Sequence, residues 1–182
     1  MSIYYLVSSL PSFNFGDKPF YTSEGFVRQC SDWISPENIK ELERVSLIPV
    51  ESYSGNIQFI KSWYELLGAL NCYSVKYRAL KLNRDSSSIL EERNKIYSDI
   101  EKGVQEAFSS ENPMEKEKRL DRLKWSILDS LEVGHMFDFD KLCIYKLRTL
   151  LCEKWLTRKE PEGKKNLEAA LSVLYKPTDE SN

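Results

Sequence analysis

The stretch "FIKSWYELLGALNCYSVKYRAL", residues 59–80, carries the clearest periodic signal in this chain of 182 residues. Seven apolar or aromatic positions in it alternate at spacings of four and three: Phe59, Trp63, Leu66, Leu70, Tyr73, Tyr77 and Leu80. Such a repeat places all of them on one face of an α-helix. The pattern predicts a helix from about Asn56 to Leu82, roughly 40 Å long at 1.5 Å per residue. We expect this face to be core, with Trp63 buried in it.

A second long helix is predicted directly after the first. The polar link "NRDSSS", residues 83–88, leads to a stripe of Ile89, Ile96, Ile100, Val104 and Phe108. The stripe predicts a helix from about Ser87 to Phe108. A link this short favours antiparallel neighbours, so the sequence predicts a long antiparallel αα-hairpin.

The rest of the chain is also helical in pattern. Pro113 opens a helix that is charged on every side until Leu120, and Asp138 can cap a helix that is apolar almost all round and should be central. Shorter helices are predicted within residues 22–48 and near residues 163–175. The sequence therefore predicts an all-α helical bundle, with residues 1–182 as a single helical domain, possible lobes at 1–110 and 111–176, and a flexible tail at 177–182.

The opening stretch "IYYLVSSLPSFNFGDKPF", residues 3–20, is aromatic and is interrupted by two prolines and a glycine. It lacks the basic start and the unbroken apolar run of a signal peptide. We expect an extended N-terminal arm, in which Tyr4 and Tyr5 point to opposite sides. No window of about 18 apolar residues exists in the chain, so we expect no direct membrane insertion.

Composition favours an ordinary globular protein. Hydrophobic residues make up 41% of the chain, charged residues 30%, and the net charge is −2, which gives no general attraction to nucleic acid. The four cysteines, Cys30, Cys72, Cys143 and Cys152, form no C-x-x-C pair. We expect reduced thiols, no zinc site and a cytoplasmic location.

Catalytic motifs are sparse. His135 is the single histidine, and it follows Glu132 with the Glu-x-x-His spacing of helical di-iron sites, which need two such pairs. No phosphate-binding glycine loop and no nucleophile motif is found. The sequence therefore favours a protein that is not an enzyme and that needs no cofactor or metal. An enzyme that uses Glu132 and His135 is the remote alternative.

The opening resembles an uncharacterised bacterial family encoded in V-type ATPase (ATP synthase) gene clusters. The residues that carry the resemblance are "YYLVSSLP" at Tyr4 to Pro11, followed by Phe15, Gly16, Asp17 and Pro19. The comparable cluster position in related rotary ATPases is held by a central-stalk protein, named C there and d in eukaryotes, which is a helical socket between the central shaft and the membrane rotor ring. The resemblance implies a similar role, with V-type ATPase subunits as partners and a peripheral place at the inner face of the cell membrane.

The function expected from these observations is that of a non-catalytic subunit or an assembly or adaptor protein. A stand-alone helical module that binds an unrelated partner is the alternative. The candidate partner-binding residues are Phe13 and Phe15 on the arm and Lys116 and Arg119 on the charged half of the helix after Pro113. Aromatic and arginine side chains dominate protein interfaces, although they also fill cores.

Overall fold

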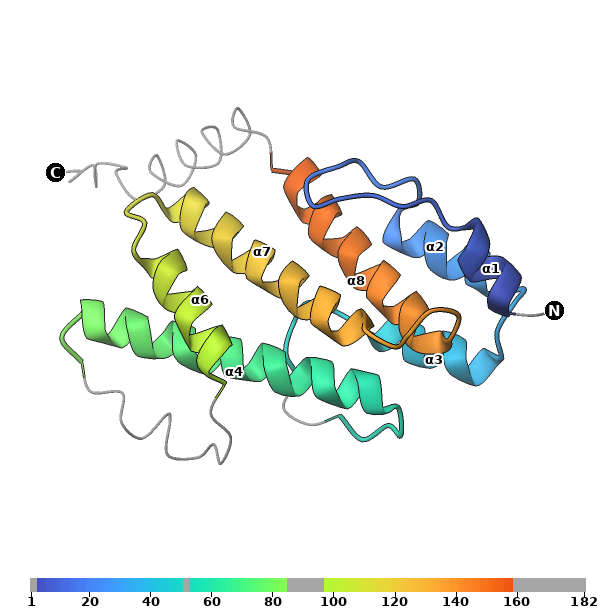
Figure 1. The fold of residues 1–182 in the computed structure, drawn as a ribbon, viewed down its shortest axis with the longest axis horizontal. Coiled ribbons are helices and arrows are strands. Elements are labelled where there is room, and N and C mark those ends of the chain that lie inside the picture. Colours follow the sequence, from blue (N-terminus) through green and yellow to red (C-terminus); the bar gives the residue numbers. More distant parts are fainter. Residues whose placement is uncertain (1–2, 51–52, 85–96, 159–182) are drawn as a thin grey trace, which may run out of the picture.

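The computed structural model describes residues 3–50, 53–84 and 97–158 and confirms the all-α prediction (Figure 1). Within these ranges the chain forms seven α-helices and no strand. Their bounds are α1 Ile3–Ser9, α2 Ser23–Cys30, α3 Pro36–Arg44, α4 Gln58–Lys81, α6 Ser98–Phe108, α7 Pro113–Glu132 and α8 Phe139–Leu156. One continuous apolar core takes side chains from each of them.

Helix α4 occupies the predicted position, and its apolar face is core over most of its length. Phe59, Trp63, Leu70 and Tyr73 are buried, whereas Leu80 near the end of the helix is 54% exposed. The indole Nε1 of Trp63 donates a hydrogen bond to the carbonyl oxygen of Ser46 at 3.0 Å. The side chain is therefore buried with its one polar group satisfied.

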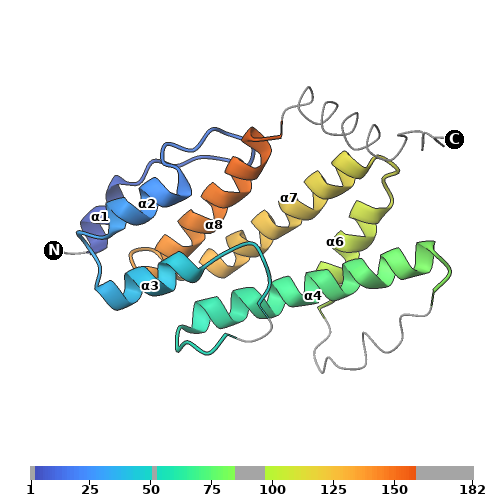
Figure 2. The same ribbon diagram turned by 180° about the vertical axis from the view of Figure 1, so that it is seen from behind.

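Helix α6 crosses α4 and does not lie antiparallel along it, as Figures 1 and 2 show from opposite sides. The contacts between the two helices follow the same order along both: the backbone N–H of Tyr97 donates to the hydroxyl of Tyr73, and farther along Glu101 pairs with Lys76 at 2.6 Å. Residues 82–97 are long enough to bring α6 back to the middle of α4. The predicted helix start at residues 87–96 lies outside the described residues.

Helix α8 is the central element, as predicted, and it contacts α1, α2, α3 and α7. The carboxylate of Asp138 caps it by accepting the backbone N–H of Lys141 at 3.0 Å. Farther along, Lys146 is buried and its Nζ donates to the carbonyl oxygens of Leu42 and Glu43 at 2.7 and 2.9 Å. Burial lowers the pKa of Lys146. This lysine fixes the C-terminal end of α3 onto α8 by satisfying its last carbonyls.

The expected extended arm is wrong for the first residues, because Ile3–Ser9 form helix α1. Apolar residues at positions 3, 6, 7 and 10 share one helical face. Leu6 and Val7 on that face are buried, and α1 packs on α8. Tyr4 and Tyr5 both stay exposed, so neither of them is the core side of the arm. Tertiary packing therefore decides the conformation of a segment too short to be helical alone.

No helix among residues 3–50, 53–84 and 97–158 has both the length and the apolar character that crossing a membrane requires. The predicted helix near residues 163–175 and the tail at 177–182 lie outside the described residues.

Candidate functional site

A groove with a volume of about 560 Å³ lies between α4 and α7. Its apolar side chains include Leu70, Val75 and Leu120, and its cationic ones are Arg78 on α4 and Lys116 and Lys124 on α7. Its remaining lining residues are Asn71, Ser74, Pro113, Glu117 and Asp121. The volume is within the range of binding pockets, so the charges of the lining residues decide what fits.

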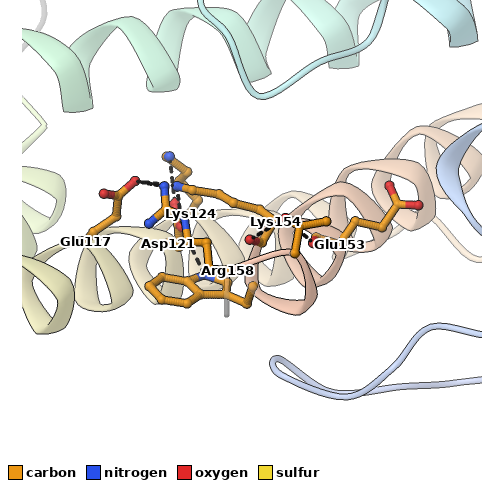
Figure 3. A network of polar contacts seen from close by, with 8 residues as sticks. Glu117, Asp121, Lys124, Glu153, Lys154 and Arg158 are labelled. Atoms are coloured by element: carbon orange, nitrogen blue, oxygen red, sulfur yellow. Dashed lines mark hydrogen bonds and ion pairs between the residues drawn. The ribbon is translucent and has the colours of Figure 1, made fainter. Parts of the chain in front are cut away.

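Asp121 on α7 is fully buried and is the centre of the polar network in Figure 3. Its two carboxylate oxygens accept from Lys124 Nζ at 2.8 Å, from Lys154 Nζ at 2.6 Å and from Trp155 Nε1 at 3.1 Å. A buried carboxylate is tolerated only when it is paired and hydrogen-bonded. Two of its three donors come from α8, so the network ties α7 to α8.

Glu117 lies one turn before Asp121 and pairs with two cations, Lys154 at the C-terminal end of α8 and Arg158 just after it (Figure 3). It pairs with Arg158 Nη2 at 2.9 Å and with Lys154 Nζ at 2.7 Å. The hydrogen bond from Arg158, and then that from Lys154, lower the pKa of Glu117 to about 2. Both carboxylates of the groove are therefore already neutralised by cations of this chain.

Arg78 and Lys116 carry the unbalanced charge of the groove. Within the described ranges no carboxylate pairs with either of them, and Lys116 Nζ lies 4.9 Å from the centre of the Phe108 ring. A groove lined by apolar side chains and by two such cations attracts a ligand that is both apolar and acidic.

The sequence-predicted residues lie in three different places. Phe13 and Phe15 are half-buried and stack edge-on against Trp125 of α7, with ring centres 6.0 and 5.7 Å from it. Arg119 donates from Nη1 to the carbonyl oxygen of Glu106 at 3.1 Å, near the C-terminal end of α6. Lys116 alone of the four lines the groove. The two rings and Arg119 therefore make contacts within the molecule.

The turn between α7 and α8 gathers His135, Asp138 and Asp140, whose potential ligand atoms lie within 4.8 Å of one another. His135 Nδ1 lies 2.6 Å from Asp138 Oδ2, and its hydrogen bond to this carboxylate raises the pKa of the imidazole. Asp138 also caps α8 through its other carboxylate oxygen, Oδ1. These contacts assign the cluster to the N-terminal cap of α8.

The Glu132–His135 pair considered from the sequence is not assembled as a site. Glu132 binds Lys141 and, at 2.6 Å, Arg148, both of them on α8. Its carboxylate is thereby directed toward α8 and stabilises the contact between the two helices.

Two features of the groove are not evident from the sequence. Asp121 lies among the charges of a helix expected to be solvated, and its one local signal is its position next to Leu120 on the side that becomes apolar. Arg78 falls on the far face of α4, away from its apolar seam. The meeting of α4 with α7 is a long-range contact, which helical periodicity does not encode.

Comparison with known proteins identifies one family. Residues 50–176 match the model of a family described as "Protein of unknown function (DUF2764)". No curated protein and no solved structure matches the chain. The matched region contains both helices of the groove, whereas residues 4–19, which carry the resemblance to V-type ATPase gene clusters, precede it. Because the match covers more than half of the 182 residues, this protein belongs to the DUF2764 family.

Proposed function

We propose that this protein is a non-catalytic subunit or an assembly or adaptor protein of a bacterial V-type ATPase, comparable to the C/d socket protein between shaft and membrane rotor. The partner identity rests on the resemblance of residues 4–19. The observation that supports partner binding is the groove between α4 and α7, which Arg78 and Lys116 line together with apolar side chains and in which neither has a carboxylate partner among the described residues.

The groove fits an amphipathic helix of a partner protein that presents apolar and acidic side chains together. Apolar side chains would displace water from Leu70, Val75 and Leu120, which is the main source of affinity. Acidic side chains would pair with Arg78 and Lys116 and speed the encounter. Glu117 and Asp121 do not repel such a helix strongly, since both are already paired with cations of this chain.

The stand-alone interaction module remains the second candidate, because the same groove would serve a partner unrelated to the ATPase. The two candidates differ in the partner that is captured. Purification of the tagged protein from native membranes, followed by mass spectrometry, separates them. We expect V-type ATPase subunits among the captured proteins, and no ATPase activity in the purified protein alone.

A charge-reversal pair tests the groove itself. Arg78→Glu with Lys116→Glu should abolish the capture, because both cations become repulsive to an acidic helix. Lys81→Glu with Lys118→Glu is the matched control, since these lysines lie on the same two helices but do not line the groove. Far-UV circular dichroism should show that both variants keep their helices.

The possible outcomes separate the claims. Capture of ATPase subunits by wild type and by the control, but not by the Arg78/Lys116 variant, supports the role and the groove. Equal capture by both variants would remove the groove from the proposal. If wild type captures an unrelated protein or no ATPase protein at all, the ATPase role is wrong.

A further inference from the structure

A second exposed surface lies at the opposite end of α7 from the groove. It consists of Tyr4 and Tyr5 on α1 and of Val133, Met136 and Phe137 in the turn between α7 and α8, and we call it the aromatic end. Figure 1 shows α1 beside that turn. The exposed fractions are 81% for Val133, 68% for Met136, 67% for Tyr5, 50% for Tyr4 and 41% for Phe137. Single exposed apolar residues are common, but a contiguous group of large ones marks an interaction site.

Contacts within the molecule hold the aromatic end in place. Tyr4 connects its two segments, because its ring centre lies 4.4 Å from that of Phe137 and 5.8 Å from that of Tyr5. On the opposite face of α1, Leu6 and Val7 are buried. Gly134 has a φ of +91°, which allows the chain to turn sharply while Met136 and Phe137 project outward. A surface that is ordered before binding loses little entropy on docking.

Charges beside the aromatic end are mainly negative. Asp129 and Glu132 are paired with cations of α8, namely Arg148 and Lys141. Asp138 directly follows Phe137 in sequence and Asp140 lies three residues after it, and His135 is the one basic side chain of the described residues that contacts them. Even with a protonated His135 and the partial charge of roughly +0.5 at the N-terminus of α8, these two carboxylates leave a net negative charge.

We propose that the aromatic end docks an amphipathic segment of a partner protein that carries lysine or arginine beside its apolar side chains. The apolar side chains would cover Tyr5, Val133 and Met136, and the basic ones would pair with Asp138 and Asp140. A second copy of this chain fits less well, because a symmetric contact would bring the two acidic pairs together. The inference rests on the proposed adaptor function and deepens it, since an adaptor needs a second surface for a second partner.

Two synthetic peptides test the charge and apolar requirements together. One is an amphipathic helix of about 14 residues, roughly four turns, built from leucine and lysine; the other has glutamate in place of lysine. Binding to the full chain is measured by fluorescence anisotropy and located by NMR shifts of assigned backbone amides. We expect the lysine peptide to shift the amides of Tyr5, Val133 and Met136, and the glutamate peptide to leave them in place.

Paired variants make the result specific. Tyr5→Ser with Met136→Ser should weaken binding of the lysine peptide at least about tenfold, because central apolar anchors dominate an interface. Ile48→Ser with Leu82→Ser removes two comparably exposed apolar side chains, 73% and 66%, outside the aromatic end and should leave binding unchanged. The Lys116→Glu groove variant should also bind the lysine peptide normally.

Several results would overturn the inference. These are equal shifts of the Tyr5, Val133 and Met136 amides with both peptides, shifts by the lysine peptide that are confined to the groove, equal loss in the two paired variants, or a dimer of the full chain that Tyr5→Ser dissociates. The test is separate from that of the ATPase role. If no ATPase subunit is captured but the lysine peptide binds the aromatic end, the ATPase role is wrong and the docking surface stands. If ATPase subunits are captured but the lysine peptide does not bind there, the docking surface is wrong and the ATPase role stands.

Discussion

Replacing Asp121 by alanine tests how α7 and α8 are held together. Asp121 is fully buried and receives Lys124, Lys154 and the indole N–H of Trp155. The substitution removes a negative charge and leaves two ammonium groups and one indole donor without their acceptor. Removing one partner from a buried ion pair costs about 3–5 kcal/mol of the free energy of unfolding.

Two features of the site place the expected loss at the lower end of that range. Lys154 keeps Glu117 as a second partner at 2.7 Å. The side chain of Lys124 is 14% exposed and that of Lys154 is 24% exposed, so both ammonium groups can regain some hydration. We therefore expect a loss of about 3 kcal/mol, a large share of the roughly 5–15 kcal/mol by which such domains are stable.

Urea unfolding followed by far-UV circular dichroism measures this loss. Asp129→Ala is the matched control on the same helix, because its carboxylate is 55% exposed and its partner Arg148 keeps Glu132. The control should cost at most about 1 kcal/mol. If Asp121→Ala does not fold, Asp121→Asn keeps the side-chain volume and an acceptor oxygen and should be measurable. A loss for the Asp121 variants no larger than that of the control would refute the reasoning.

Three further outcomes are expected. Trp63→Ala should lower the free energy of unfolding by about 3–5 kcal/mol in the same urea assay, because a fully buried indole leaves a cavity. The pKa of Glu117 is lowered from 4.5 to about 2, chiefly by Arg158, so its contribution to the free energy of unfolding is present above pH 4.5 and is lost as pH falls through about 2. In acid titrations, the free energy of unfolding of the Glu117→Gln variant should therefore fall less over that interval than that of the wild type. Phe13→Asp should lower the melting temperature, because its ring packs 5.2 Å from that of Tyr145; an unchanged melting temperature would show that this packing contributes little.

The long helices could be predicted because their apolar faces repeat over many turns. Helices α4, α7 and α8 begin at or within a few residues of their predicted starts, and Asp138 is the cap that the sequence predicted for α8. Helix α1 could not be predicted in the same way, because seven residues ending in Ser8 and Ser9 give too short a pattern to outweigh the prolines that follow. Its stability comes from α8, which local sequence does not reveal.

The candidate surfaces were only partly accessible to sequence reasoning. Lys116, selected from the charged start of α7, lines the groove, but Arg78, the other cation without a carboxylate partner there, lies on a different helix. Phe13 and Phe15 had the appearance of an exposed aromatic arm, and only the tertiary structure brings Trp125 against them. The residues at 133–137 did carry a signal: large apolar side chains in a turn have no helical face of their own to bury them.

Helix α7 gives the two surfaces a fixed relation to each other. From Lys116 at the groove to Glu132 beside the aromatic end, α7 rises about 24 Å at 1.5 Å per residue. Ion pairs join it to α8 at both ends, through Lys154 near the groove and through Arg148 near the turn. A segment bound at the groove and another bound at the aromatic end would therefore be held at a fixed distance by α7 and α8. Movement of one bound segment would then move the other. An adaptor between a turning shaft and a rotor needs that property, whereas a simple tether between two proteins would work equally well through a flexible linker.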